Sequence, residues 1–124
     1  MHAKINVNKQ LIERNASMIV IANATRYGSG AVINPVGRLD DDLFEVIIVK
    51  KISMMEIFKM VFTHSNYDPQ KTELFQTNSL HIYSKHKAHF QVDGEYMGKI
   101  NKVEASILPK AINVIIAKPR LADW

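Results

Sequence analysis

The sequence contains no cysteine, which excludes disulfide bonds and thiolate metal sites. No apolar run approaches the roughly 20 residues that a membrane-spanning helix needs. The first residues, Met-His-Ala-Lys-Ile-Asn, lack the apolar centre of an export signal. We therefore expect a cytoplasmic protein, and 124 residues are enough for one domain, residues 1–124, with a real core.

Acidic residues are fewer than basic ones, 12 against 16, which gives a net charge of +4. This balance favours anionic partners such as nucleotide phosphates, acidic lipid headgroups or nucleic acid, or serves solubility alone. The compact basic clusters are Lys50-Lys51 and Lys85-His86-Lys87. Neither is interleaved with aromatic residues as in a groove for single-stranded nucleic acid, so no nucleic-acid partner is predicted.

Alternating or continuous apolar runs predict most of the chain to be strands. They cover residues 4–8, 18–22, 43–49, 72–84 with a bend near 77–79, 88–92, 102–108 and 111–117. Residues 18–22 suit a strand covered on both faces. Lys9–Asn15 is polar and is predicted to be a turn, and Lys85-His86-Lys87 is predicted to be a hairpin tip.

One helix is predicted, over residues 54–63. Ser53 and Glu56 form a capping-box pair, and apolar residues recur after them at spacings of three and four. Its Met- and Phe-rich side favours core packing, with the wall of a lipid cleft as the alternative. Because strands mostly follow strands, we expect a mainly β fold, an antiparallel β-sandwich with one surface helix.

Three consecutive carboxylates, Asp40, Asp41 and Asp42, lie between the Pro/Gly turn of residues 34–37 and a β-prone apolar run. Because they repel one another, such a loop is either solvated or holds a cation. A second carboxylate, Glu95, directly follows an Asp-Gly turn. The residues alone favour an ordinary exposed turn glutamate, and the alternative is a general base held by rigid structure.

Four motifs in order resemble the C-terminal domain of the diacylglycerol kinase catalytic family, which includes bacterial lipid kinases and, more distantly, sphingosine and ceramide kinases. They are Asn23…Tyr27-Gly28-Ser29-Gly30, Pro35…Leu39-Asp40-Asp41, Asp93-Gly94-Glu95 and Leu108-Pro109…Val114. The resemblance covers roughly residues 4–117. It implies a β-sandwich second domain of a two-domain kinase that phosphorylates a diacylglycerol-like lipid hydroxyl.

The resemblance also implies roles for individual residues. Glu95 would be the base that deprotonates the lipid hydroxyl. A structural Mg²⁺ would be held by Asp41 and by the backbone carbonyls of Arg38 and Leu43. The chain departs from the family pattern at Asp42 and at Ser29, where relatives commonly have glycine. His86 and His89 offer no competing zinc site, since no third ligand lies near them in sequence.

The family's phosphate-binding Gly-Gly-Asp-Gly-Thr loop does not occur in this sequence. The resemblance therefore implies that ATP binds mainly to an N-terminal domain outside this chain, and that this chain alone is inactive. We expect residues 41 and 95 to lie side by side, facing that domain. Expected partners are a lipid substrate, ATP and the inner face of the membrane, touched peripherally, and a homodimer is possible. The alternatives are a sphingosine- or ceramide-type kinase domain, or a non-catalytic β-sandwich module that binds anionic partners.

Overall fold

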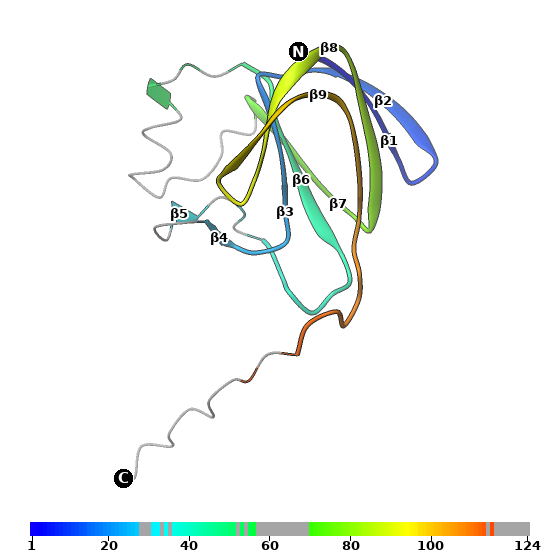
Figure 1. Cartoon of the computed structure of the whole chain (residues 1–124), viewed down its shortest axis with the longest axis vertical. Helices are drawn as coiled ribbons and strands as arrows, with labels where there is room; N and C mark the ends of the chain where they lie inside the picture. The colour runs from blue at the N-terminus through cyan, green and yellow to red at the C-terminus, as the bar shows by residue number, and fades with distance from the viewer. Residues whose placement is uncertain are drawn as a thin grey trace.

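The computed structural model describes residues 1–27, 31–32, 34, 36–51, 53, 55–56, 70–113 and 115. Figure 1 shows their strands as two sheets that face each other, with a short strand pair beside them. The strands are β1 (His2–Val7), β2 (Gln10–Asn15), β3 (Met18–Ala22), β4 (Arg26–Tyr27), β5 (Ala31–Val32), β6 (Phe44–Val49), β7 (Thr72–Thr77), β8 (Ser79–Val92) and β9 (Glu95–Ser106). Within the described part, no helix has the length and apolar character needed to cross a membrane.

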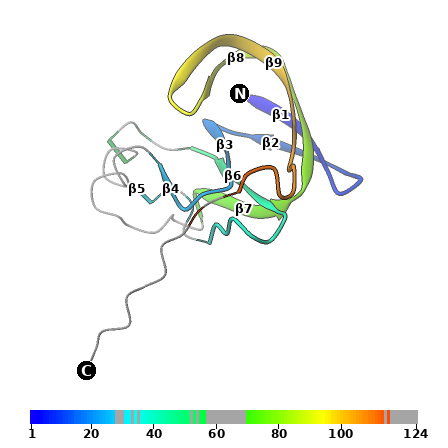
Figure 2. The same cartoon turned by 60° about the horizontal axis from the view of Figure 1, so that its bottom comes forward.

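The first sheet has the strand order β2-β1-β8-β9 and the second the order β3-β6-β7. Strands β4 and β5 form a separate pair, and all pairings are antiparallel. The two larger sheets pack face to face, as the turned view in Figure 2 also shows. The prediction of a mainly β, antiparallel sandwich is confirmed.

The core lies between the two sheets. Ile5 of β1, Ile48 of β6 and Leu80 of β8 are each at most 1% exposed and belong to one apolar cluster. Burying such a side chain stabilises the fold by roughly 1.5–3 kcal/mol. Strand β6 is buried along its whole length, on both faces, which confirms the strand predicted at residues 43–49.

The two sheets are joined at a corner and by an ion pair. Strand β7 ends at Thr77 and β8 begins at Ser79, so one residue, Asn78, separates them, and the predicted bend is confirmed. The Thr77 hydroxyl donates to the Ser79 carbonyl at 2.8 Å. Across the sheets, Arg14 of β2 donates twice to the Glu73 carboxylate of β7, both times at 2.8 Å.

The prediction of a turn over Lys9–Asn15 is wrong, because Gln10–Asn15 is strand β2. The turn is only two residues long. Asn8 and Lys9 have φ of 50° and 63°, the left-handed conformation that a tight hairpin turn requires at both central positions. Strand β2 lies at a sheet edge and is mostly exposed, so its polar composition does not oppose strand formation.

The predicted hairpin tip at Lys85-His86-Lys87 is also wrong. These residues lie inside β8, where its register with β9 shifts between Tyr83 and Ala88. The chain reverses instead at Asp93 and Gly94, with φ of 48° and 90°. An Asp-Gly pair favours this turn type, since aspartate and above all glycine tolerate positive φ.

Three further predictions meet the structure only in part. Strand β3 is half exposed rather than covered on both faces, with Met18 and Ile21 38% and 37% exposed. Residues 111–113 and 115 form no strand, and the rest of the predicted strand 111–117 lies outside the described residues. The capping box is confirmed, because the Ser53 N–H donates to the Glu56 carboxylate at 3.0 Å and the Glu56 N–H to the Ser53 hydroxyl at 3.3 Å. Most of the predicted helix 54–63 lies outside the described residues.

Candidate functional site

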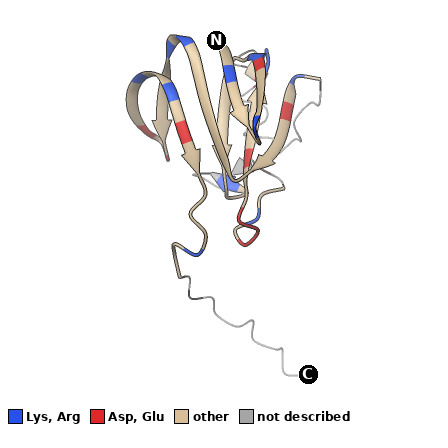
Figure 3. Cartoon of the chain, turned by 90° about the vertical axis from the view of Figure 1, so that its right-hand side faces the viewer, with Lys and Arg blue, Asp and Glu red and all other residues tan. Residues whose placement is uncertain are grey.

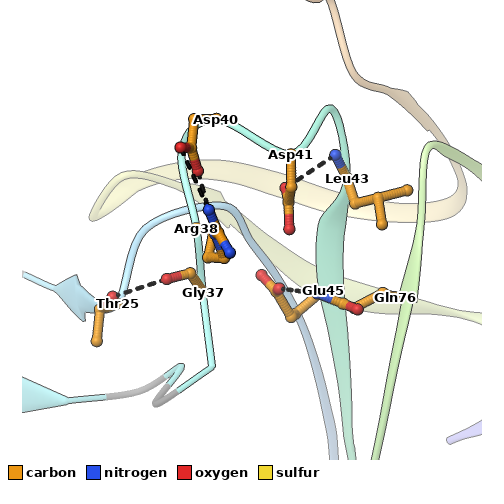
Figure 4. A network of polar contacts seen from close by, with 8 residues as sticks. All are labelled: Thr25, Gly37, Arg38, Asp40, Asp41, Leu43, Glu45 and Gln76. Atoms are coloured by element: carbon orange, nitrogen blue, oxygen red, sulfur yellow. Dashed lines mark hydrogen bonds and ion pairs between the residues drawn. The ribbon is translucent and has the colours of Figure 1, made fainter.

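The acidic loop, residues 38–43, leads directly into β6 (Figure 4). Arg38 donates to both carboxylate oxygens of Asp40, at 3.2 and 3.3 Å. This hydrogen-bonded ion pair lowers the pKa of Asp40 from its usual value. Both side chains are about 70% exposed, at 68% and 74%, so the first part of the loop is solvated.

Asp41 and Asp42 shape the second part of the acidic loop. Asp41 is half-buried, and its Oδ1 accepts the Leu43 backbone N–H at 3.1 Å, which closes a tight turn. Asp42 has a φ of 55°, in the left-handed region. This is the position where the family resemblance expects glycine, and aspartate tolerates the conformation better than most residues. The loop thus keeps a sharp turn despite the substitution.

Asn23 holds the two ends of the acidic loop together. With its amide nitrogen turned toward them, Asn23 donates to the carbonyl of Arg38 at 3.1 Å and to that of Leu43 at 3.0 Å. These are the two carbonyls that the resemblance assigns to Mg²⁺. No role for Asn23 was predicted from the sequence, although Asn23 begins the first of the four motifs.

The oxygen atoms around this loop fit a hard cation. Mg²⁺ prefers carboxylate and carbonyl oxygens at 2.0–2.1 Å in an octahedron, whose edges are therefore roughly 3 Å long. The side-chain oxygen of Asn23, turned toward the carbonyls of Arg38 and Leu43 in place of the nitrogen, would lie at this spacing from both. Among the described residues, no three His, Asp or Glu side chains gather around a metal position. A cation here would therefore depend on Asp41 and neutral oxygens.

A polar cluster lies beside the acidic loop and is here called the buried polar cluster after its two buried members, Asn34 and Glu45; its third member, Gln76, is exposed. Glu45 of β6 and Asn34 are both 0% exposed. The Glu45 carboxylate accepts the Asn34 amide at 2.5 Å and the Gln76 amide of β7 at 2.8 Å, the second of which is drawn in Figure 4. This cluster was not predicted from the sequence. Its one signal was a glutamate inside an apolar strand, which burial makes costly unless it is hydrogen-bonded.

Gly37 connects the buried polar cluster to the acidic loop. The Gly37 N–H donates to the Asn34 carbonyl at 3.2 Å, across the turn that the sequence predicts at residues 34–37. A Cβ at this position would collide with the Asn34 side-chain amide and lie 3.2 Å from the Ala24 carbonyl carbon. Glycine is therefore needed here for close approach of the chain.

Glu95 lies at the tip of the β8–β9 hairpin, as the first residue of β9, opposite Val92. It is exposed, and its carboxylate contacts no hydrogen-bond or ion-pair partner among the described residues. Next to it, the Tyr96 hydroxyl lies 3.0 Å from Nδ1 of His89. The Asp-Gly turn therefore presents Glu95 at the tip of the hairpin, with no cation paired to its carboxylate in the described part of the chain.

The structure does not bring Asp41 and Glu95 together. Asp41 precedes β6 in the second sheet and Glu95 begins β9 in the first. The hairpin tip and the acidic loop lie well apart in both Figure 1 and Figure 2. The expectation that residues 41 and 95 lie side by side is wrong, because the acidic loop enters β6 beside the corner where β8 begins, whereas Glu95 lies at the far end of the β8–β9 hairpin. Any roles they have are therefore separate.

Comparison with known proteins places this fold. A family model for the "YegS C-terminal NAD kinase beta sandwich-like domain" matches residues 1–116. No curated protein sequence matches the chain significantly. The similar solved structures include three from Bacillus anthracis str. Sterne, two of provisionally assigned diacylglycerol kinases and one of a diacylglycerol kinase.

These three structures share the fold with the chain. They superpose with TM-scores of 0.71, 0.71 and 0.68 at 18%, 18% and 19% sequence identity. Each superposition covers 87% of this chain but only 35%, 36% and 38% of the other. The chain thus spans little more than a third of the length of these structures.

Proposed function

Because the chain belongs to the family of YegS C-terminal NAD kinase beta sandwich-like domains, we propose that it is the C-terminal domain of an ATP-dependent lipid kinase. The longer protein would phosphorylate a diacylglycerol-like hydroxyl at the cytoplasmic face of a membrane. The names of the similar structures and the extra length of their chains support this proposal. The nucleotide would be held by an N-terminal domain outside this chain, so this chain alone would be inactive.

The position of Glu95 carries the proposal. A base must come within about 3 Å of the hydroxyl that it deprotonates, and must be free to accept the proton. Glu95 is exposed at the tip of a hairpin and is not paired with any cation of the described residues. A lipid hydroxyl can approach it without displacing an existing contact.

In the proposed reaction, Glu95 accepts the proton of the lipid hydroxyl as the hydroxyl oxygen attacks the γ-phosphorus of ATP. The bond between that phosphorus and the β–γ bridging oxygen breaks, and ADP leaves with the electron pair. Protein groups contribute to phosphoryl transfer mainly by positioning and by charge stabilisation. From this chain, Glu95 would supply the proton acceptor, and the other groups would come from the missing domain.

A structural Mg²⁺ belongs to the same proposal. Asp41 and the carbonyls of Arg38 and Leu43 would hold it, and the Asn23 amide would turn its oxygen toward it. The ion would neutralise Asp41 and fix the acidic loop rather than take part in the reaction. Without the ion, the Asn23 nitrogen closes the same loop.

The experiment is a kinase assay on the full-length protein that contains this chain, with diacylglycerol, ATP and Mg²⁺. Replacing a general base typically lowers kcat by 10²–10⁴-fold, so Glu95→Gln should lose at least about 100-fold. Glu104→Gln is the matched control, since Glu104 is also an exposed glutamate of β9. Full activity in Glu95→Gln would remove Glu95 as the base.

The acceptor lipid needs its own measurement. Sphingosine and ceramide present a hydroxyl to the same kind of base, so the fold does not separate them from diacylglycerol. A panel of the three lipids, each assayed with the wild-type full-length protein, should show the largest kcat/KM for diacylglycerol. A larger kcat/KM for sphingosine or for ceramide would instead assign the protein to the sphingosine- or ceramide-type kinases.

A further inference from the structure

The β8–β9 hairpin extends beyond the sheet that supports it. Strand β1 pairs with β8 only at Leu80–Ser84. Residues 85–101, here called the arm, therefore lie beyond β1 and form a two-stranded ribbon, irregular near its base, without a third strand among the described residues. Figures 1 and 2 show the arm curving over β3. A ribbon of two strands alone is marginally stable in water, so contact on its faces is expected.

The inner face of the arm accounts for one such contact. Ala88, Phe90 and Ile100 are half-buried and line, together with Ile19 and Ile21 of β3, an open cavity of about 90 Å³. The outer face and the tip contact nothing comparable within the described residues. The arm thus has one covered and one uncovered side.

The tip of the arm exposes large apolar side chains. Val92, Tyr96 and Met97 flank the Asp-Gly turn and are 47%, 62% and 58% exposed. Tyrosine prefers the boundary between water and lipid, where its ring is apolar and its hydroxyl is solvated. Flexible methionine adapts to irregular apolar surroundings.

The arm is also basic. Three exposed lysines lie along it, Lys85, Lys87 and Lys99, and the carboxylates it carries are only Asp93 and Glu95, both at the tip. Within the described part of the chain, none of these lysines forms an ion pair. Figure 3 shows basic segments along the curve of the arm. Each lysine near an anionic membrane contributes roughly 1 kcal/mol of attraction.

We propose that the arm is the membrane-docking element, which lies on an anionic lipid surface with Tyr96 and Met97 entering the headgroup layer. Lysines are depleted at protein–protein interfaces, so three lysines without ion pairs, beside exposed apolar residues, fit a lipid surface better than another protein domain. The inference rests on the proposed function in one respect, that docking brings Glu95 to the depth of a lipid hydroxyl.

The first test measures binding of this chain to vesicles, without ATP or diacylglycerol. We expect it to sediment with phosphatidylcholine vesicles that contain phosphatidylglycerol, and not with phosphatidylcholine alone. Replacing Lys85, Lys87 and Lys99 by glutamine should weaken binding on the order of 100-fold, from about fivefold per lysine. The matched control replaces three exposed lysines outside the arm, Lys9, Lys51 and Lys110, and should weaken binding far less.

A second measurement stays valid even where the charge variants fold poorly. Because the chain has no cysteine, Met97→Cys can carry a single polarity-sensitive fluorophore. Its emission should shift to the blue on anionic vesicles. Leu11→Cys is the control, since Leu11 is equally exposed, at 63%, on the opposite edge of the same sheet. This probe should not respond.

Equal loss of binding in the two lysine triples, no binding to anionic vesicles, or an unshifted Met97→Cys probe would overturn the docking proposal. None of these results depends on catalysis. A full-length protein that phosphorylates lipid while its arm fails to bind vesicles would keep the proposed function and lose only the docking surface. If the chain binds anionic vesicles but the full-length protein lacks kinase activity, the docking surface would stand and the proposed function would be wrong.

Discussion

Asn34 donates its side-chain amide to the Glu45 carboxylate at 2.5 Å, and both side chains are fully buried. Gln76 donates to the other carboxylate oxygen at 2.8 Å. The turn before the acidic loop is thereby fastened to β6 and, through Gln76, to β7. The acidic loop is thus held mainly by the hydrogen bonds that the uncharged amides of Asn34 and Gln76 donate to the Glu45 carboxylate, and not by the exposed Arg38–Asp40 pair.

Glu45→Gln should destabilise the domain. The carboxylate accepts a hydrogen bond on each oxygen, and an amide would place its own NH₂ against one of the two donors. Leaving a buried donor unsatisfied costs about 1–3 kcal/mol in the free energy of unfolding. Urea unfolding measures it, with the exposed Glu104→Gln as the control that should stay near wild type. Equal stability of both variants would contradict the structural role of Glu45.

Gly37→Ala should destabilise the domain because the added methyl collides with the Asn34 amide. Overpacking of this kind costs roughly 1–3 kcal/mol. The cost should shrink when Asn34→Ala removes the obstructing group. Gly98→Ala serves as the comparison: its φ is 93° and nothing lies within 4 Å of the added Cβ. The cost there is conformational and should not change with Asn34→Ala.

The ion pair between the two sheets predicts a dependence on pH. Its hydrogen bond to Arg14 holds the pKa of Glu73 below the usual 4.5. A depressed folded-state pKa stabilises the fold above about pH 4.5 and loses that contribution as the pH falls through the lower folded value. Glu73→Gln should therefore cost about 1 kcal/mol near neutral pH and progressively less in acid. An unfolding difference that stays constant from pH 7 to pH 2 would contradict this.

The magnesium proposal predicts that Tm rises with the logarithm of the Mg²⁺ concentration once that concentration exceeds Kd. At about 100 times its Kd, a ligand of the folded state adds roughly 2.7 kcal/mol of stability. Wild type should show such a rise with Mg²⁺ in calorimetry, and Asp41→Asn should not. Asp40→Asn is the matched control and should respond like wild type, because Asp40 pairs with Arg38 in solvent. An identical response in Asp41→Asn and wild type would exclude Asp41 as a ligand.

The strands with a strong apolar pattern were predictable from the sequence, and the ribbon was not. Strand β6 shows a continuous apolar run because both of its faces are buried. The arm has little core to cover, so polar residues occupy it freely and the Lys85-His86-Lys87 triplet resembles a turn. The Asp93-Gly94 pair was a stronger hairpin signal than this triplet, since aspartate and glycine tolerate the two positive φ values that the turn has.

The candidate site was predictable only where its residues are neighbours in sequence. Asp41 and Glu95 stand in short motifs that carry the family resemblance. The Glu45 cluster joins residues 11 and 31 positions apart, and Asn23 reaches the acidic loop from the loop between β3 and β4. Such contacts come from tertiary packing, which local patterns do not encode. Mg²⁺ binding by Asp41 and proton acceptance by Glu95 stay predictions, which the calorimetry with Mg²⁺ and the kinase assay test.

The corner at Asn78 has a mechanical consequence. With one residue between β7 and β8, the two sheets share a joint too short to act as a hinge, and the Ile107 N–H donates to the Asn78 carbonyl at 2.8 Å to brace it. The base of the β8–β9 hairpin is thereby fixed to the sandwich. When a force acts on the tip of the hairpin, the hairpin should bend mainly at the irregular stretch near residues 84–87. The corner should transmit the rest of that force to both sheets.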